Sequence, residues 1–508
     1  MTRVALSGAW PAPSSRWARW MLALLAPLSA GAAALWLGQD AGWDLRNYHF
    51  YVPFAWLHGR LDQDVAVAHI ATYYNPTLYL PFYWAVENWP PRLVGFVLGG
   101  LAGINAWLLA LIAMQAGGRE EREGRSWAPI VLALVGLLGA MAVSELGTSA
   151  GDNIVSILVL ASLWMLLRWR AVLAAGGPRA WATAIFSGLP CGIAFGLKLP
   201  FAVYAVAACL ALLAMPFPWQ RRLAAAWTFG VGVLVGVAVA GGYWLLKMWQ
   251  RYRNPLFPYF NDVFGSPWAT AGSYRHEIFI PQGASEWLMF PFRFALDPLQ
   301  VAEVEFRDLR MPLLYAAAVL LLLRFAWRRV APAAAEPTGS ELDRQATTFL
   351  AVFAVVAFVL WARLFAVSRY TMPIEMLAPV IAWSALGAYA GSARHRTWLA
   401  VALGLLLVGS TQIGNWGRRS WSDDYFGVTS PAIADPDRSL VLLAGVEPMG
   451  YLVPMMPARL RFLRIDGYFT GPSPTPNASD RAMHAAVESH DGPIYLLYRG
   501  WEEERAAA

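Results

Sequence analysis

Charged residues and cysteines are both scarce in this sequence. Of its 508 residues, 14% are Asp, Glu, Lys or Arg, whereas 58% are hydrophobic. A chain of this size with so little charge cannot cover a water-soluble surface, so the composition predicts a membrane protein with many spans. The two cysteines, Cys191 and Cys209, fall inside apolar segments. This placement excludes a disulfide framework and a cysteine metal site, and it favours small buried side chains.

Other features are missing as well. No segment repeats at a fixed period, which gives no support to a solenoid or to the paired halves of a transporter. The basic start, MTRVALSGAWPAPSSRWARW, lacks a small-residue cleavage site after its apolar run, so we expect an uncleaved first span. The net charge of +6 comes with arginines clustered beside apolar segments, which indicates membrane topology and anionic lipid rather than nucleic acid.

Eleven apolar runs approach the roughly 20 residues that a helix needs to cross a bilayer. They lie at roughly 18–39, 92–116, 127–146, 151–168, 182–197, 200–215, 224–246, 311–327, 347–365, 371–390 and 397–412. A cytoplasmic N-terminus makes every inner connection basic and leaves the outer connection 145–152 without Lys or Arg. The odd number of spans then places the C-terminus outside. The inner arginines are Arg3, Arg16, Arg19, Arg119, Arg122, Arg125, Arg168, Arg170, Arg179, Arg221, Arg222, Arg324, Arg328, Arg329, Arg394 and Arg396.

The connections and the tail differ in character from the spans. Two outer connections, about 40–91 and 247–310, mix aromatic, proline and charged residues, as interfacial segments do. The inner connector RRVAPAAAEPTGSELDRQ, which starts at Arg328, is expected to be flexible. We expect residues 1–412 to form the transmembrane domain and residues 413–508 to form a small outer α/β domain with a structural or acceptor-gripping role.

Short patterns in the tail support this α/β domain. The apolar runs SLVLLAG, RFLRI and PIYLLYR are typical of buried strands. The segment from Ala478 to His490 has helical spacing, with Ser479 or Asp480 as the expected cap. The tail has no glycine-rich phosphate loop, so we assign it no chemistry.

The stretch from Gly42 to Pro81 is too polar to span a bilayer and too aromatic to lie free in water. It contains WDLRNYHFY and TYYNP, and NPLFPYFND and SRYTMPIE follow later in the chain. In these motifs, and over most of its length from about Asp40, the chain resembles the GT-C superfamily of integral-membrane glycosyltransferases. That superfamily includes protein O-mannosyltransferases and lipid A aminoarabinose transferases.

The resemblance implies both a fold and a reaction. The fold is an all-α polytopic GT-C-like membrane protein, here with the small C-terminal α/β domain outside. The reaction moves a sugar from a polyprenyl-phosphate donor to a lipid, glycan or protein acceptor, with inversion. It takes place at the periplasmic face of a bacterial inner membrane.

Asp44 is the residue for which we expect a catalytic role. It stands where the chain leaves the first span, and a carboxylate at that depth is costly unless it is paired or used. Glycosyl transfer needs a base that takes the proton of the acceptor hydroxyl, and the resemblance gives this part to the loop acid. Asp40 is the rival for the role. Capping of an interfacial helix is the structural alternative for Asp44.

Basic residues are expected to meet the leaving phosphate, on which negative charge accumulates. Arg369 and Tyr370 lie in SRYTMPIE at the outer end of a span, where the resemblance implies contact with the lipid phosphate. Arg363 precedes them by six residues. Lys198, between two short spans, must either snorkel to the interface or meet an anion.

Several acidic and amide residues are further candidates for substrate binding. Glu145 and Asp152 flank the short outer turn and suit sugar hydroxyls or a metal, with helix capping by Asp152 as the alternative. Asp64 is either a second acid or metal ligand near the site or, with Asp62, part of a solvated turn. Asn254 opens an aromatic loop. This loop either binds sugar or is simply folded at the membrane interface, and the sequence favours neither.

Aromatic and histidine residues complete the candidates. Tyr48 and His49 follow Asp44 closely and are expected to contact substrate. His49, His58 and His69 are too irregularly spaced for a zinc site, so we expect interfacial hydrogen bonds from them. The sequence requires no cofactor, although a divalent ion is compatible with its carboxylates.

Two other function classes compete with the transferase. A transporter or flippase of lipid-linked sugars would use Asp44, Asp152 and Arg369 as an intramembrane charge relay. A non-catalytic GT-C-like scaffold would serve envelope assembly. The large aromatic outer loops and the absence of an internal repeat argue against the transporter.

Overall fold

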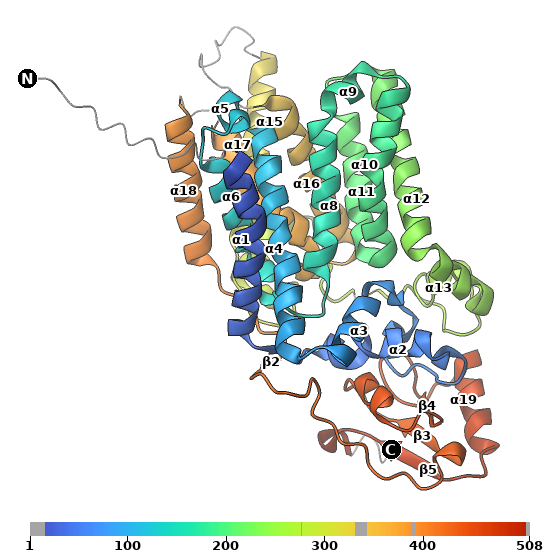
Figure 1. Ribbon diagram of the computed structural model, residues 1–508. Coiled ribbons are helices and arrows are strands. Elements are labelled where there is room, and N and C mark those ends of the chain that lie inside the picture. Colours follow the sequence, from blue (N-terminus) through green and yellow to red (C-terminus); the bar gives the residue numbers. More distant parts are fainter. Residues whose placement is uncertain (1–15, 276, 331–342, 388–391, 504–508) are drawn as a thin grey trace, which may run out of the picture.

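The computed structural model describes residues 16–275, 277–330, 343–387 and 392–503. Long helices run side by side in a bundle, and a small sheet lies beyond one end of it (Figure 1). The bundle consists of α1 (Arg16–Leu37), α4 (Pro91–Ala116), α6 (Ala128–Leu137), α7 (Ala140–Ser144), α8 (Asp152–Arg168), α10 (Pro178–Leu197), α11 (Ala202–Leu213), α12 (Trp219–Tyr252), α15 (Arg310–Val330), α16 (Arg344–Leu364), α17 (Met372–Gly387) and α18 (Ala393–Ser410).

Helices cover all eleven of the apolar runs. Among the described residues, α1, α4, α10, α12, α15 and α16 are long and apolar enough to cross a membrane, and two shorter helices, α6 and α11, are also apolar. The length and composition of the helices therefore support a polytopic membrane protein, with six candidate spans rather than eleven. The residues before Arg16, which include most of the basic N-terminal segment, lie outside the described residues. So do residues 331–342, which make up most of the connector that we expect to be flexible.

One predicted run, 127–146, is broken into two helices. Helix α6 ends before Leu138 and α7 begins after Gly139. The carboxylate of Glu375 enters at this break and accepts a hydrogen bond from the backbone N–H of Met141 (3.1 Å). A Cβ atom at Gly139 would lie 1.8 Å from Oε1 of Glu375, so any larger residue there would force the Glu375 carboxylate to move. The break is thus caused by a contact from α17 that hydropathy does not reveal.

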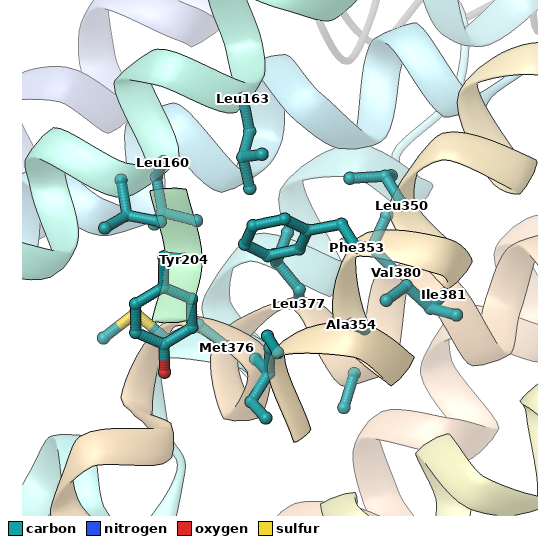
Figure 2. Packing of buried hydrophobic residues seen from close by; sticks show 14 of the residues in the cluster. Leu160, Leu163, Tyr204, Leu350, Phe353, Ala354, Met376, Leu377, Val380 and Ile381 are labelled. Carbon is teal, nitrogen blue, oxygen red and sulfur yellow. The ribbon is translucent and has the colours of Figure 1, made fainter. Parts of the chain in front are cut away.

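The core of the bundle is formed where α8, α11, α16 and α17 meet. Figure 2 shows the ring of Phe353 beside Leu163, with Leu377 and Tyr204 close by. The rings of Tyr204 and Phe353 stack at 5.9 Å between centroids. The hydroxyl of Tyr204 donates to the carbonyl oxygen of Tyr370, so this core also fixes the short segment between α16 and α17.

The two ends of the bundle differ. Short helices α5 (Arg119–Glu123) and α9 (Arg170–Ala175) lie at one end, where several of the predicted inner arginines are found. Helices α2 (Tyr51–Leu57), α3 (Leu80–Asn88) and α13 (Asn261–Phe264), together with the sheet, lie at the other (Figure 1). Helix α14 (Ala284–Leu296) belongs to the second long connection.

The tail forms the predicted strands and helix. Strands β3 (Leu440–Leu443), β4 (Arg461–Arg464) and β5 (Ile494–Leu497) make a parallel sheet in the order β4-β3-β5, and α19 (Ala478–Glu488) precedes β5. The cap of α19 is Asn477 rather than Ser479 or Asp480. Its side chain accepts from the N–H of Ser479 (2.8 Å), while Asp480 accepts from the N–H of Asn477 (2.9 Å). A reciprocal capping box of this kind satisfies more N–H groups than either predicted cap would alone.

The sheet and the first long connection share one core. Strand β1 (Gln39–Asp40) pairs antiparallel with β2 (Arg418–Arg419). Val65 forms a parallel bridge with Leu463, a residue of β4. Tyr51, Val52 and Val67 are buried against Val441, Leu443 and Phe462. The tail therefore packs onto the loop that contains the candidate site residues.

An ion pair fixes this junction. The guanidinium of Arg60 donates to both oxygens of Asp64 (2.9 and 2.7 Å). Asp64 also accepts from the hydroxyl of Tyr51 (3.1 Å) and the N–H of Phe462 (3.0 Å). Asp64 is thereby committed to holding the loop against β4, whereas Asp62 is exposed and pairs with Arg251.

We expect Asp64→Ala to destabilise the protein by about 3–5 kcal/mol, because it leaves the buried guanidinium of Arg60 without its partner. Thermal unfolding in detergent measures the effect. Asp437→Ala is the matched control, since its partner Arg459 is 77% exposed and the pair contributes little. Equal melting temperatures for the two variants would contradict the structural role of Asp64.

Candidate active site

The candidate site lies at the end of the bundle that faces the sheet. Four elements meet there: the start of α8, the end of α10, the π-helix η1 (Leu45–His49) and the 3-10 helix η7 (Ser368–Thr371). The loop after α1 supplies η1, and the connection between α16 and α17 supplies η7. Residues from distant parts of the chain are brought together in this way.

Asp44 and Arg369 form a salt bridge at the centre of this arrangement. Their side chains are 20% and 17% exposed, so the pair is largely buried and still reachable. Asp44 precedes η1, but its side chain makes no capping hydrogen bond. Burial alone would raise the pKa of Asp44, yet the charges of Arg369 and, more weakly, Lys198 bring that pKa below its usual value. Asp44 is therefore an ionised carboxylate at neutral pH.

Arg369 has donors that the protein does not use. Its guanidinium lies over the rings of Tyr370 (5.4 Å) and Trp416 (5.7 Å). The Nε of Arg369 and the Nε1 of Trp416 are buried and have no hydrogen-bond partner among the described residues. Since buried donors are almost always satisfied in native proteins, two unpaired donors side by side are suited to an anion.

Lys198 is paired rather than snorkelling. Its Nζ donates to Oδ2 of Asp152 (2.6 Å) and to the carbonyl oxygen of Ala150 (3.0 Å), and it lies over the ring of Tyr370 (5.4 Å). Burial would lower the pKa of Lys198, but the charge of Asp152 outweighs it and the pKa is raised. The cap of α8 is Gly151, so the Asp152 carboxylate serves Lys198 and not the helix end.

Glu145 adds a second acid to this pair. Burial, and then the charge of Asp152, raises the pKa of Glu145 well above its usual value. Oε2 of Glu145 and Oδ1 of Asp152 are buried and without a hydrogen-bond partner in the part of the chain that the structure describes. The two carboxyl groups also interact with each other, which contributes to the raised pKa of Glu145.

We expect Lys198→Met to destabilise the protein by about 3–5 kcal/mol, because it leaves Asp152 charged, buried and unpaired. The double variant Lys198→Met/Asp152→Asn should recover part of the loss. Melting temperatures in detergent test both expectations. Lys247→Met is the control, since Lys247 lies over the ring of Trp56 (4.5 Å) and makes no salt bridge with the described residues. A double variant no more stable than Lys198→Met would contradict the pairing.

Asp40, the rival of Asp44, is fully engaged in structural hydrogen bonds. It accepts from the N–H of Gly42 (2.9 Å) and from both the N–H and the hydroxyl of Ser149 (2.8 Å each). Asp40 thus ties the turn before α8 to the end of α1. Its two oxygens are used, whereas Asp44 has only Arg369 as a salt-bridge partner among the described residues.

Tyrosines form the wall of the site next to Asp44. Tyr48 is buried and lies edge-on to Tyr74 (5.3 Å between centroids) and Tyr79 (5.6 Å). The hydroxyls of Tyr74 and Tyr259 are hydrogen-bonded to each other, and both phenols interact with Asp44 through its charge. Sequence reasoning singled out Tyr48 alone of these four. In the sequence, only the motifs TYYNP and NPLFPYFND pointed to Tyr74 and Tyr259 as site residues. Nothing in the sequence pointed to Trp416 or Ser149.

Three candidates lie apart from this group. Asp64 holds the sheet, as described above. Asn254 is buried and closes its own loop, donating to the carbonyl oxygen of Tyr259 (2.9 Å) and accepting from the N–H of Leu256 (2.9 Å). Arg363 is exposed and lines a separate cavity of about 360 Å³ with Arg275 and others. The second long connection therefore reaches the site through Tyr259 instead of Asn254.

Of the other histidines of this loop, His58 makes a local contact, and His69 contacts the tail, where its Nδ1 accepts from the N–H of Tyr468 (3.2 Å). His58 bonds to the carbonyl oxygen of Phe54 (2.9 Å), and His69 stacks on Trp43 at 6.0 Å between centroids. Within the described ranges, no group of three or more His, Cys, Asp or Glu residues is arranged to hold a metal ion.

Comparison with known proteins finds similarity among solved structures. No protein-family model matches the chain, and no curated protein matches it. Among solved structures, the chain is similar to the Archaeoglobus fulgidus oligosaccharyltransferase, crystallised in complex with zinc and sulfate. The two share 12% sequence identity with a TM-score of 0.46, over 94% of this chain and 68% of the archaeal one.

Proposed function

We propose that this protein is a GT-C-like membrane glycosyltransferase. It moves a sugar from a polyprenyl-phosphate donor to a lipid, glycan or protein acceptor. The observation that carries the proposal is the reachable Asp44–Arg369 pair, surrounded by buried donors and acceptors that have no partner among the described residues. Such a group of charges is expensive to bury unless a polar, anionic substrate completes it.

The two charges of the pair suit the two halves of the reaction. The Asp44 carboxylate takes the proton of the acceptor hydroxyl while that oxygen forms a bond to the anomeric carbon of the donor sugar. The bond between the anomeric carbon and the phosphate oxygen breaks, and its electron pair leaves with the polyprenyl phosphate. Arg369, with the N–H of Trp416, stabilises the negative charge that gathers there. Attack from the face opposite the phosphate inverts the anomeric centre.

The surrounding polar groups suit the sugar. Glu145 and Asp152 offer oxygen atoms to hydroxyl groups, and Lys198 pairs with the carboxylate of Asp152. Tyr48 and Tyr370 line the site beside the charged groups, with Lys198 and Arg369 over the ring of Tyr370. A divalent ion could bind the same carboxylates, but no step of the reaction as proposed depends on it.

The position of the site suits a lipid-borne donor. The site lies where the apolar helices end, so a polyprenyl chain can stay in the hydrocarbon while its phosphate reaches Arg369. The basic end of the bundle is the opposite one, which by the positive-inside rule makes the site end periplasmic in a bacterial inner membrane. We assign residues 1–412 to the transmembrane domain. Residues 413–508 form the periplasmic unit that covers the site loop.

The profile of envelope glycans and lipid-linked sugars tests the proposal. Cells that lack the protein should accumulate a polyprenyl-phosphate sugar and lose that sugar from one glycolipid, glycan or protein, as measured by mass spectrometry. Re-expression of the protein should restore it. An unchanged profile would refute the transferase. Flux of lipid-linked sugar across vesicles that contain the purified protein would then support a flippase, and absence of flux would leave the scaffold.

A further inference from the structure

His49 is held rigidly beside Asp44. Its side chain is buried, with 1% of the residue exposed. Its ring stacks on Tyr79, with centroids 4.3 Å apart and planes at 20°, and the edge of Tyr48 meets it at 4.3 Å. A ring packed on two sides in this way cannot turn, so its two nitrogens have fixed directions.

The hydrogen bonds of His49 decide which nitrogen bears the proton. Nδ1 lies 2.7 Å from the hydroxyl oxygen of Ser149, and that hydroxyl donates its single proton to Oδ2 of Asp40 (2.8 Å). Oxygens of Asp40 also accept backbone N–H groups, so Asp40 acts as an acceptor. Ser149 therefore accepts from His49, and the proton of His49 is on Nδ1.

The other nitrogen is then an unused acceptor. Nε2 of His49 is buried and has no hydrogen-bond partner among the described residues. Burial lowers the pKa of His49 to about 3, which outweighs the opposite effect of Asp44, while Lys198 and Arg369 lower it further. The ring is neutral at pH 7, and Nε2 keeps its lone pair.

The π-helical winding of η1 brings this lone pair to the site. Asp44 and His49 are five positions apart, and a π-helix joins each residue to the fifth along the chain. The same spacing in an α-helix, with 3.6 residues per turn, would turn the two side chains toward different sides. Single π-turns are frequent at functional sites, and in this one Asp44 and the ring of His49 lie close enough to interact through charge.

We propose that Nε2 of His49 is a built acceptor for a hydroxyl group of the substrate, next to the oxygen that Asp44 deprotonates. Ser149 and Asp40 are positioning residues that hold the imidazole in the accepting tautomer. The ligand class is a polyhydroxylated sugar that presents an O–H donor. The identity of the ligand rests on the proposed function, whereas the tautomer does not.

The tautomer can be measured directly by ¹⁵N NMR of histidine-labelled protein in nanodiscs. The chain has 7 histidines, and the signals lost in His49→Phe identify His49. We expect a neutral ring with the proton on Nδ1 at pH 7, and a mixture of tautomers in Ser149→Ala. A proton on Nε2, or a doubly protonated ring at pH 7, would overturn the inference whatever reaction the protein performs.

The role in binding is tested by paired variants in the transfer assay, followed by mass spectrometry of the product. His49→Phe keeps an aromatic ring between Tyr48 and Tyr79 but removes the acceptor, so kcat/KM should fall about 10–100-fold. His49→Gln supplies an amide oxygen and should recover part of the activity. His58→Phe, at a histidine that bonds only locally, is the control and should leave kcat/KM unchanged.

The outcomes separate this inference from the proposed function. Wild-type activity in His49→Phe, alongside loss of activity in Asp44→Asn, would overturn the inference and leave the transferase intact. If the wild-type protein transfers no sugar, the proposed function fails. The position of the His49 proton still decides whether Nε2 is an open acceptor.

Discussion

Asp44→Asn is expected to lower the rate of sugar transfer by about 10²–10⁴-fold while the protein stays folded and membrane-inserted. The amide keeps the shape of the side chain and can still accept a hydrogen bond from Arg369. It cannot take a proton from the acceptor hydroxyl. Because Asp44 pairs with Arg369 at the surface of the site and caps no helix, its loss should be chemical rather than structural.

The envelope glycan profile of cells that express Asp44→Asn at the wild-type level measures this loss. We expect the same missing sugar as in the deletion strain, together with an unchanged melting temperature of the purified variant. Asp40→Asn is the informative comparison, because Asp40 is engaged by Gly42 and Ser149 and takes no proton from the acceptor hydroxyl in the proposed reaction. A full glycan profile in Asp44→Asn would remove Asp44 from the chemistry.

Arg369→Gln should have the second large effect, in two ways. Loss of the guanidinium removes charge stabilisation of the leaving phosphate, which is worth about 10²–10³-fold in kcat. It also removes the largest influence that opposes the effect of burial on Asp44, so the pKa of Asp44 should rise. A base works only when ionised, so activity falls as pH drops through its pKa. The acid limb of the pH profile therefore moves upward.

The pH dependence of kcat/KM, from about pH 4 to pH 9, tests this expectation. In the wild type, the lowered pKa of Asp44 keeps the acid limb below this range. Arg369→Lys should hold the limb near its wild-type position while losing part of kcat, since a lysine keeps the charge but not the planar fork. Arg363→Gln, at the exposed arginine six residues earlier, is the control. An acid limb that stays in place in Arg369→Gln would contradict the coupling.

Hydropathy located the helices, since ten of the eleven apolar runs lie mainly on one helix each and the run 127–146 lies on two, although only six helices are long and apolar enough to be candidate spans among the described residues. Alternation and length also located the three strands and α19 in the tail. What hydropathy missed depends on contacts between distant residues. The carboxylate of Glu375 breaks the run at Gly139, and nothing in that run itself signals a neighbour from α17. The cap of α19 moved to Asn477 because two side chains there satisfy each other.

The candidate site shows the same division. Because a charge is costly to bury in a membrane, the sequence identified Asp44, Lys198 and Arg369 as candidates, each by itself. Their pairing depends on the fold, since Asp44 and Arg369 are 325 residues apart. The same cost applies to Asp64, which the structure satisfies with Arg60 at the sheet. A buried acid in a sequence therefore indicates that a partner exists, and only the fold tells whether that partner is an arginine of the chain or a substrate.

The junction between the first loop and the tail has a consequence for biosynthesis. Asp64 receives a hydrogen bond from Phe462, 398 residues later, and β1 pairs with β2 after the last helix of the bundle. The loop that contains Asp44 is thus synthesised early, but the tail residues that it contacts are synthesised only when the chain is nearly complete. The helices are inserted first, and the loop closes last. A chain that is cut short before the tail should be inserted but inert, and a protease outside the membrane should find its first loop open.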